Sequence, residues 1–462
     1  MRRRAATAGA ALLACAALQF TACAPVGPNY VRPQVTTPPQ YRFVEAVSAA
    51  SFADLPWWQV FDDPALQALL REAIASNLDV RAAAARVEEA RARAGVVRSF
   101  LYPQVDGTAS PTVQQNTDDG DLHQTGVYGA QLSWQLDLFG RIRREHESAL
   151  AQVLATEQAR RGVLVTLVGD VASVYFLLRE LDWQLDIARR TLQINDQTVT
   201  YFQDRLSGGV SNRLEVDQVR ANRAQTAASI PEIEQRIATG EHELSLLLGR
   251  VPGTIARPAP APGGQVPPTI PPGLPASLLE RRPDVVQAEE LLVAANADVG
   301  AARALFFPAV SLTGLLGGVS GDLTTTLGGA GLVWSVGAGL LQPVYNAGRN
   351  RRNLEAAQAR FDAALAEYRK AALNGYREVA DALITIQKLA SVRIERQTAV
   401  DVLQDAAELA RSRYDIGVAT SLEILIADQQ LFQQQLLLAQ AYGAELRARA
   451  DLYRALGGGW QP

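Results

Sequence analysis

The sequence of 462 residues has few of the side chains that most often carry out chemistry. It contains two cysteines, three histidines and one methionine, and only 6% of its residues are aromatic. His146 and His242 each lie between two glutamates in helix-like sequence, without a second histidine or cysteine at metal-ligand spacing. We therefore interpret both as solvated surface residues and expect neither a metal site nor a cofactor.

Motifs of catalysis and of nucleic-acid binding are also missing. We find no glycine-rich phosphate loop and no nucleophile elbow. Charged residues make up 20% of the chain and give a net charge of -4, whereas nucleic-acid-binding proteins usually present a basic surface. We expect a protein that is not an enzyme and has no nucleic-acid partner.

The N-terminus has the features of a secretory signal. Arg2, Arg3 and Arg4 precede an apolar run that is too short and too rich in alanine to span a bilayer permanently. Cys15 and Cys23 both follow small residues, and we favour Cys23 as the lipidation site because a polar, proline-broken tether follows it. We therefore predict a lipoprotein signal peptide over 1–22. The alternative is an ordinary signal peptide with incidental cysteines.

The rest of the chain is an internal repeat, in which one sequence unit occurs twice. At a shift of 205 positions, Asp79 matches Asp284, Val80 matches Val285, Gly95 matches Gly300, Arg98 matches Arg303 and Pro103 matches Pro308. At a shift of 208, Arg205 matches Arg413, Gly209 matches Gly417, Val210 matches Val418, Leu214 matches Leu422 and Glu215 matches Glu423. The second copy should therefore contain three additional residues between Pro308 and Gly348.

A proline-dense linker over 250–275 separates the two copies and cannot be helical. We predict the following division of the mature chain: an anchored N-terminal tether and equatorial segment over 23–64, a first repeat over 65–249, a second repeat over 276–457 and a tail over 458–462.

Each repeat contains two runs in which apolar residues alternate with polar or small ones, within 104–137 and 309–343. A period of two indicates β-strands, and a length of about ten residues fits tilted strands that cross a membrane. A half-buried hairpin of a soluble protein would alternate in the same way. The alternation alone is therefore weak support for a membrane.

Two very long helices give the stronger signal. Residues 141–206 contain no proline, and a spacing of four and three places apolar residues along one face from Leu167 to Leu206, interrupted only by Asn195. This is the pattern of a coiled coil, and 1.5 Å per residue gives a helix of roughly 100 Å. The second copy repeats the pattern over 348–414, where Arg393 and Arg396 interrupt the apolar face.

Shorter helices flank the long ones. They are predicted over 64–100 and 284–306, before the strands, and over 212–248 and 421–456, after glycine turns. Two shorter helices together are about as long as one long helix. We therefore expect two of them stacked end to end beside each long helix.

The connections constrain the topology. Both ends of each hairpin continue into helices, so all helices lie on one side of the membrane. Four strands cannot close a barrel, and open edges are not tolerated in lipid, so other copies of the chain must complete it. One alternative is a lipid-anchored coiled-coil structural protein without a pore, which the membrane-length hairpins argue against. A self-standing porin would need at least about eight strands in one chain.

Several specific motifs are spread over the whole mature chain. They are LPWW and FDDP within 55–64, LDLFGR at 136–141, LLERRPD at 278–284, QPVYNAGR at 342–349 and ALGGGW at 455–460. With these motifs the chain resembles the outer-membrane factor family of tripartite efflux pumps, of the TolC and OprM type, and in particular its lipoprotein branch.

The resemblance implies a mixed α and β membrane protein that forms a homotrimer. Each chain would give four transmembrane strands to a twelve-stranded β-barrel and its long helices to a coiled-coil α-barrel in the periplasm. An equatorial collar would come from 30–64, the linker and the C-terminus. The implied partners are a periplasmic adaptor protein, an inner-membrane transporter, often of the resistance-nodulation-division class, and the lipid of a Gram-negative outer membrane. The chain itself would be a passive exit duct.

The resemblance also assigns roles to the turns that end the long helices. An adaptor would contact two tips, formed by Ser207, Gly208 and Gly209 and by Asp415, Ile416 and Gly417; the alternative is that the glycines only cap the helices. In such channels a closed gate joins a tyrosine of the second tip to an acid of the first, here Tyr414 and Glu215. Leu214 and Ala419 replace the threonine and arginine of that lock, so two of its parts are missing.

Inward-facing acids ring the aperture of these channels, and the two positions here hold Glu423 and Ile426. Three copies of Glu423 would form a negative ring that favours cations, and Ile426 would add an apolar constriction. The alternative is that Glu423 is a solvated acid favoured by the dipole at a helix N-terminus. Asp428 lies about 140° around the helix from Glu423 and should face another way.

We expect the mature protein to begin at an acylated Cys23, because stable anchoring needs two acyl chains. Mass spectrometry of the N-terminal peptide measures this directly. Cys23→Ser should remove the lipid while the strands still hold the protein in the membrane, and Cys15→Ser is the matched control that should retain the lipid. A mature terminus at Cys15, or an unmodified one, would contradict the assignment.

Overall fold

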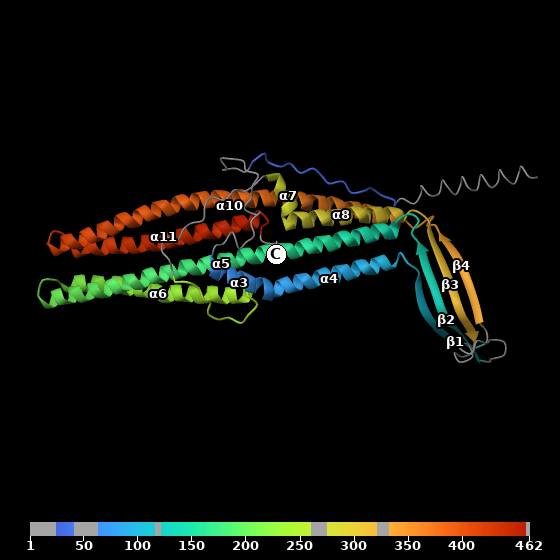
Figure 1. Cartoon of the computed structure of the whole chain (residues 1–462), viewed down its shortest axis with the longest axis horizontal. Helices are drawn as coiled ribbons and strands as arrows, with labels where there is room; N and C mark the ends of the chain where they lie inside the picture. Colours follow the sequence, from blue (N-terminus) through green and yellow to red (C-terminus); the bar gives the residue numbers. More distant parts are fainter. Residues whose placement is uncertain (1–24, 41–62, 116–121, 260–274, 321–331, 459–462) are drawn as a thin grey trace, which may run out of the picture. The chain divides into compact units, whose positions relative to one another are not determined.

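The computed structural model describes residues 25–40, 63–115, 122–259, 275–320 and 332–458. The first repeat contains α3 (Pro64–Ser76), α4 (Leu78–Ser99), β1 (Gln104–Gln115), β2 (Leu122–Leu136), α5 (Arg141–Ser207) and α6 (Arg213–Leu247) (Figure 1). The second contains a 3-10 turn (Pro275–Ser277), α7 (Leu278–Arg281), α8 (Pro283–Ala304), β3 (Ala309–Ser320), β4 (Leu332–Leu341), α10 (Arg349–Asp415) and α11 (Ser421–Ala455).

The sequence repeat is also a structural repeat. Both α5 and α10 have 67 residues, both α6 and α11 have 35, and both α4 and α8 have 22. β3 begins 205 positions after β1, whereas α10 begins 208 positions after α5, so the three additional residues lie between the starts of β3 and α10. Glycines with a left-handed backbone recur in the same places: Gly140 and Gly348, Gly209 and Gly417, and Gly249 and Gly457.

The chain forms two compact units, which we describe separately. One unit contains the sheet, the N-terminal residues up to Val35 and the helical residues of 85–158 and 287–370. The other contains the remaining described residues, which include the ends of both long helices and all of α6 and α11.

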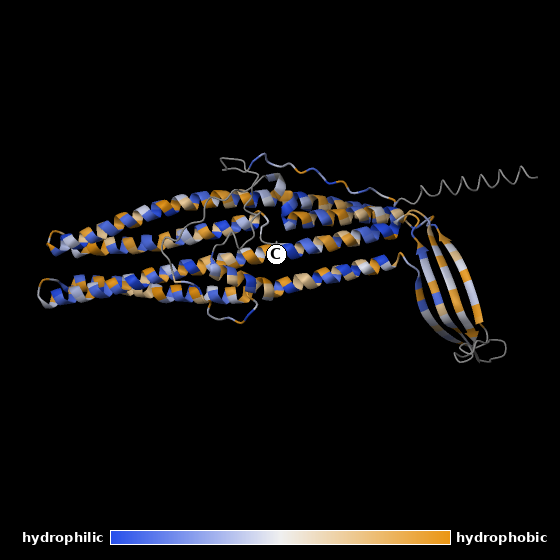
Figure 2. Cartoon of the chain, in the orientation of Figure 1, coloured by the Kyte–Doolittle hydropathy of each residue, from blue (hydrophilic) through white to orange (hydrophobic). Residues whose placement is uncertain are grey.

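The four strands form one antiparallel sheet in the order β1-β2-β3-β4 (Figure 1). Residues that pair across strands share a face of the sheet. One face carries two rows rich in apolar residues: Val105, Leu132, Gly314 and Val336, and Gly107, Ala130, Leu316 and Trp334. Asp106, Gln131, Leu315 and Ser335 form a row between them, on the other face. Hydropathy therefore alternates along β1 and β2, as the sequence predicts, and less strictly along β3 and β4, where Leu315 and Val333 fall on the other face (Figure 2).

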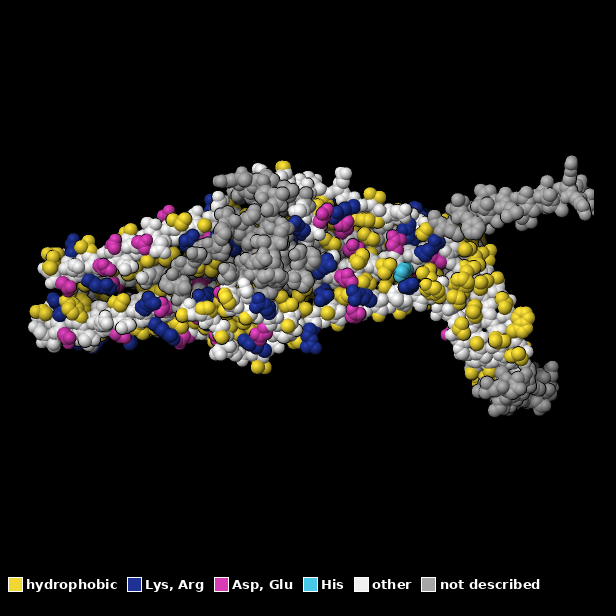
Figure 3. Space-filling view, viewed as in Figure 1, with side chains coloured by type: hydrophobic (Ala, Val, Ile, Leu, Met, Phe, Trp, Pro, Cys, Tyr) yellow, Lys and Arg dark blue, Asp and Glu magenta, His cyan; other side chains and the backbone are white. Residues whose placement is uncertain are grey.

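The apolar face of the sheet is uncovered in the single chain. Leu332, Trp334, Val336 and Leu340 of β4 are 65–78% exposed, and hydrophobic side chains gather over the strands in Figure 3. β1 and β4 are the first and last strands of the sheet, so in the described part of the chain each pairs along one edge only. A sheet with one bare apolar face and two open edges is incomplete in water and in lipid.

The main core of the helical unit is built around α5. Leu178 and Leu181 of its predicted apolar face are fully buried, and Phe202 is 1% exposed. Asn195, the polar interruption, is also buried and donates a hydrogen bond to the Thr226 hydroxyl of α6 at 2.9 Å. The most apolar stretch of α5 is long enough to cross a membrane, but half of it is buried inside the chain, as expected for a core helix.

The prediction of one helix from Pro64 to about Phe100 was wrong, because the chain breaks at Asn77 into α3 and α4. The Asn77 side-chain oxygen accepts hydrogen bonds from the backbone N–H groups of Asp79 and Val80, at 2.8 and 3.0 Å, and so caps α4. Its amide nitrogen donates to the carbonyl of Leu247 at the end of α6, at 2.9 Å. The alanine-rich sequence favours a continuous helix, but this side-chain cap ends it.

The second repeat breaks at the equivalent position, Arg282. This buried guanidinium donates to the carbonyl of Ala455 at the end of α11, at 2.7 Å. It also pairs with Asp284 at 2.7 Å and Glu378 at 2.8 Å. We call α6 and α11, which follow the tips of the long helices, the return helices. In both repeats the end of the return helix is thus bonded to the polar side chain at the break. The return helix and the helix that follows the break, α6 with α4 and α11 with α8, meet end to end, as predicted.

The arginines that interrupt the apolar face of α10 have partners on α11. Arg393 pairs at 2.8 Å with Glu445, which is only 1% exposed. Arg396 donates to the side-chain oxygen of Gln434 at 2.5 Å. The interruption of the second apolar pattern is therefore a polar contact between α10 and α11 and not a solvated face.

Candidate gate at the helical tips

Both helical tips are glycine turns. Gly209 and Gly417 have φ angles of +77° and +80°, a conformation that glycine adopts without strain. The N–H of Val210 donates to the Arg205 carbonyl at 2.9 Å, and that of Val418 donates to the Arg413 carbonyl at 3.0 Å. These glycines therefore cap α5 and α10.

Large apolar side chains are exposed at both tips. Val210 and Leu214 of the first tip are 63% and 67% exposed, and Ile416, Val418 and Leu422 of the second are 52–74% exposed. Exposed apolar groups that are gathered in one place commonly mark an interaction surface.

Tyr414 lies in a buried cluster where the two hairpins, α5–α6 and α10–α11, meet. Its ring is 7% exposed and packs with Phe202, Val216 and Ile424. Burial raises the pKa of Tyr414, and the nearby negative charge of Glu215 raises it further. Glu215 itself accepts a hydrogen bond from the Ser211 hydroxyl. Glu215 thus acts on Tyr414 through its charge, whereas the hydrogen bond that it accepts from Ser211 is made within the first tip.

A set of contacts that the sequence analysis missed joins α5 to α10 beside Tyr414. The hydroxyl of Tyr201 donates to the Asp415 carboxylate at 3.0 Å and accepts a hydrogen bond from Arg205 at 3.1 Å. The guanidinium of Arg205 also lies over the rings of Tyr414 and Tyr201, 5.0 and 5.5 Å from their centres. We call Tyr201, Arg205, Tyr414 and Asp415 the tip clasp.

One signal in the sequence could have drawn attention to this set. Tyr201 and Arg205 are four residues apart and therefore lie on the same face of α5. Their partners on α10, however, are more than 200 positions away in the sequence, and only the tertiary structure brings them together.

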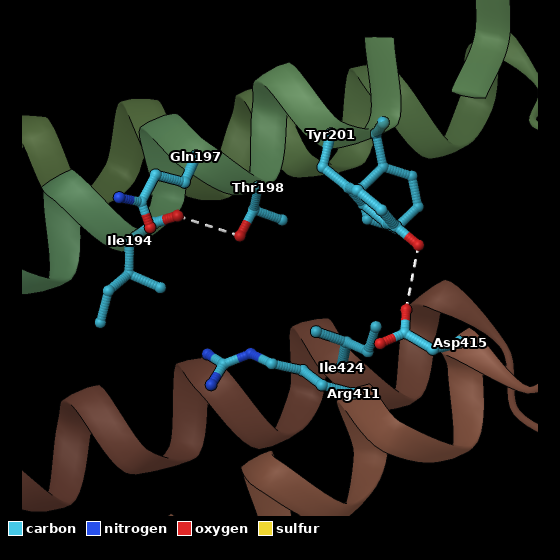
Figure 4. A pocket seen from close by; sticks show the side chains of 8 residues that line it. Ile194, Gln197, Thr198, Tyr201, Arg411, Asp415 and Ile424 are labelled. Atoms are coloured by element: carbon cyan, nitrogen blue, oxygen red, sulfur yellow. Dashed lines mark hydrogen bonds between the residues drawn. The ribbon is translucent and has the colours of Figure 1, made fainter. Parts of the chain in front are cut away.

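A cavity of about 390 Å³ lies beside the tip clasp, as Figure 4 shows. Its lining residues come from α5, α10 and α11: Ile194, Gln197, Thr198, Tyr201, Phe202, Arg411, Asp415 and Ile424. Figure 4 shows the hydroxyl of Tyr201 pointing toward the carboxylate of Asp415, and the dashed line between them marks their hydrogen bond. The hydroxyl of Thr198 turns back to its own helix and donates to the Ile194 carbonyl at 3.0 Å.

The two acids near the start of α11 have different environments. Glu423 is exposed and forms a capping box with Thr420, whose N–H donates to its carboxylate at 3.3 Å. Asp428 is 8% exposed and pairs with Arg411 of α10 at 2.7 Å. Burial raises the pKa of Asp428, although Arg411 opposes this shift. The two acids thus face different ways, as predicted. Ile426, on the exposed side, is 46% exposed.

The remaining expectations concern a lipid and a metal. Cys23, the expected lipidation site, lies outside the residues that the structure describes. Within the described ranges, no group of three or more histidine, cysteine, aspartate or glutamate side chains is arranged to hold a metal ion.

Comparison with known sequences identifies the family. The profile of the family described as outer membrane efflux protein matches residues 69–250 and 274–458, which together make up most of the chain. The chain belongs to the outer membrane efflux protein family. This confirms the resemblance that the motifs indicate, and the two matched stretches fall one in each repeat.

Curated relatives match over nearly the full length. The cation efflux system protein CusC of Escherichia coli O6:H1 is 35% identical over 454 residues, which cover 97% of this chain and 98% of CusC. The solvent efflux pump outer membrane protein SrpC of Pseudomonas putida is 37% identical over 87% of both chains. SilC of Salmonella typhimurium, named a probable outer membrane lipoprotein, is 33% identical over 95% of this chain and 96% of SilC.

Solved structures share the fold. The outer-membrane channel OprN superposes with a TM-score of 0.86 at 33% identity, over 95% of this chain and all of OprN. The open MtrE outer membrane channel of Neisseria gonorrhoeae gives 0.87 at 28% identity, over 95% and 99% of the two chains. This chain is therefore an outer-membrane channel of an efflux pump, and it has the mixed α and β fold of these channels.

The tip clasp should hold the channel closed. Tyr201→Phe removes the hydroxyl shared by Asp415 and Arg205, and the loss of about 0.5–1.5 kcal/mol per hydrogen bond should raise the open population roughly two- to tenfold. Single-channel recording in planar bilayers measures that population. Asp415→Asn should add little in the Tyr201→Phe background, because the two share one bond.

Thr198→Ala is the matched control, since Thr198 lines the same cavity but bonds only within α5 in the contacts described above. An equal rise in opening for Thr198→Ala and Tyr201→Phe would show that the cavity, and not the clasp, is responsible.

Proposed function

We propose that three copies of this chain form a passive exit duct in a tripartite efflux pump. The duct receives substrates that an inner-membrane transporter, of the resistance-nodulation-division class, delivers through a periplasmic adaptor protein. The chain itself catalyses no reaction. A lipid on Cys23 anchors each copy in the outer membrane.

The open sheet edges are the observation that carries this proposal. β1 and β4 each leave one row of backbone N–H and C=O groups without a partner strand in the described chain. An unsatisfied backbone group costs several kcal/mol in lipid, and membrane sheets are therefore closed. If β4 of one copy pairs with β1 of the next, three copies close a ring of twelve strands. The bare apolar face, with Trp334 and Val336, then faces lipid.

The exposed apolar tips support contact with the adaptor. We propose that the adaptor covers Ser207, Gly208, Gly209, Asp415, Ile416 and Gly417. The neighbouring exposed Val210 and Val418 would be buried on docking, which is favourable for apolar area removed from water.

Light scattering and bilayer recording together test the duct. The purified protein in detergent should have about three times the mass of the 49.7 kDa chain, less its signal peptide, and should give discrete conductance steps after reconstitution. A stable monomer with native β-sheet content would contradict the barrel. A trimer that never conducts would favour the alternative of a lipid-anchored structural protein without a pore.

We further propose that the periplasmic gate is formed by Glu423, Ile426, Tyr414 and Glu215. Three Glu423 carboxylates near the axis attract cations, Ile426 forms a dry constriction, and Tyr414 with Glu215 belongs to the contact between the two tips. Glu423 and Ile426 are three positions apart and so lie on the same side of α11. Both side chains are exposed there.

Glu423→Gln should lower the preference of the open channel for cations several-fold and weaken block by multivalent cations. Glutamine also completes a capping box, so this change removes the charge and leaves the helix cap in place. Glu423→Ala should have the same effect on selectivity and in addition loosen the tip. Reversal potentials in asymmetric salt give the measurement.

Glu215→Gln removes the equivalent acid in the first turn of α6, which the proposal assigns to the contact between the tips and not to the charged ring, so it should leave the cation preference unchanged. Unchanged selectivity in Glu423→Gln would place Glu423 outside the pore.

A further inference from the structure

A cavity of about 340 Å³ lies at the end of the sheet, within the unit that contains the strands. Its lining comes from three segments that join strands to helices: 135–141 between β2 and α5, 304–309 between α8 and β3, and 341–350 between β4 and α10. We call it the junction cavity. Its apolar lining includes Leu136, Leu138, Phe139, Leu305, Phe307 and Leu341.

Several polar groups of the lining already have partners in the protein, among them Asp137, Arg141 and Asn350. The Asp137 carboxylate accepts the backbone N–H groups of Ile142 and Arg143 at 3.0 and 2.9 Å, and so caps α5. The Asn350 amide donates to the Leu305 carbonyl at 2.6 Å. Phe139 and Phe307 stack with ring centres 4.8 Å apart. What the cavity offers a ligand is therefore mainly apolar surface.

The N-terminal residues 25–32, which we call the N-terminal strap, are bound beside this cavity. The N–H of Val26 donates to the carbonyl of Phe139 at 3.1 Å. Arg144 is 3% exposed and donates to the side-chain oxygen of Asn29 at 2.9 Å. Asn296 of α8 donates to the Pro28 carbonyl at 3.1 Å. A buried arginine and two backbone-directed hydrogen bonds thus fix the strap.

Close packing fixes the strap as well. A Cβ atom on Gly140 would lie 2.5 Å from the Cα of Pro25, and one on Gly300 would lie 3.0 Å from the Val26 carbonyl oxygen. The first distance leaves no room for any side chain at Gly140. Pro25 is therefore held against the residue that follows Phe139.

The strap determines how far Cys23 lies from the cavity. Cys23 is two residues before Pro25, and an extended chain spans at most about 3.6 Å per residue, so their Cα atoms are within roughly 7 Å. Pro25 touches Gly140, which lies between two residues of the cavity lining, Phe139 and Arg141. We propose that one acyl chain carried by Cys23 occupies the junction cavity. This inference rests on the lipidation of Cys23 proposed above.

The two features suit one another chemically. An acyl chain needs apolar surface, and the leucine and phenylalanine side chains of the cavity supply it at the end of the strands, while the polar Tyr345 and Arg349 of the lining are exposed. A chain held there would fix the anchor at one place on the protein, whereas an anchor with both chains free in the bilayer would only keep the N-terminus near the membrane. The strap therefore positions the lipid, and the cavity receives it.

Photo-crosslinking in native membranes tests the proposal. Leu138 lines the cavity and is 42% exposed, so it tolerates replacement by the photoreactive residue p-benzoylphenylalanine. After irradiation, mass spectrometry should find the N-terminal lipopeptide joined to the peptide that contains position 138, and fragmentation should place the new bond on the acyl chain. A bond only to the peptide part, which the strap already holds beside Phe139, would count against the proposal. The same residue at Leu150, which is 47% exposed on α5 but is not part of the cavity lining, is the control and should give no such product.

A second variant tests the strap. Arg144→Gln should lower the yield of the product about tenfold, as expected for the loss of a charge-assisted hydrogen bond. Arg160→Gln, at an exposed arginine farther along α5, should leave the yield unchanged. The native trimer mass of each variant confirms that it has folded.

Two outcomes overturn the inference alone: an acylated N-terminal peptide with no product at position 138, or products at 138 that contain only free phospholipid. An N-terminal peptide without acyl chains overturns the lipidation itself, and with it the inference, but leaves the duct untouched.

Discussion

The structure depends on one constraint, that backbone hydrogen-bonding groups in lipid must all have partners. The chain contributes a sheet of four strands. Its two edge strands, β1 and β4, each have a pairing strand on one side only among the described residues. Among the described residues no further strand pairs with those edges, and both ends of each hairpin continue into helices. The need for other copies is therefore a property of the sheet itself. In the proposed trimer, the helices that continue from the strands would also be shared between copies.

The duplicated repeat conserves the devices that end its helices and changes the contacts between them. Asn77 and Arg282 differ chemically, yet each donates to the last carbonyl groups of a return helix, at Leu247 and Ala455. Between the long helix and the helix that follows its tip, the first repeat buries a neutral pair, Asn195 with Thr226, and keeps its ion pairs at exposed positions, whereas the second buries Glu445 in a pair with Arg393. A buried ion pair adds little net stability, but its geometry is specific, and leaving one partner alone is costly.

The periodic features of the fold were predictable, and the contacts that depend on one or two side chains were not. The apolar face of α5, the alternation in the strands and the end glycines such as Gly209 were read from spacing, because each reflects a regular period or a backbone that only glycine adopts easily. The break at Asn77 was missed because alanine-rich sequence on both sides favours one helix. The tip clasp was missed because Tyr201 and Asp415 are far apart in the sequence. The pairing of Tyr414 with Glu215 came from resemblance and stays a prediction: the charge of Glu215 acts on Tyr414, and its carboxylate accepts a hydrogen bond from Ser211.

The capping box of Glu423 and its proposed place in a charged ring do not exclude each other. The cap uses a carboxylate oxygen, 3.3 Å from the Thr420 N–H, and the side chain stays exposed with its charge. A carboxylate is also electrostatically favoured there by the dipole of α11. Asp428 cannot take over this role, because Arg411 neutralises it at 2.7 Å within the contact between α10 and α11. Of the acids at positions 423 and 428, only Glu423 therefore has a charge free to act on an ion. The helix cap holds that charge at the tip, on the same exposed side of α11 as the apolar Ile426.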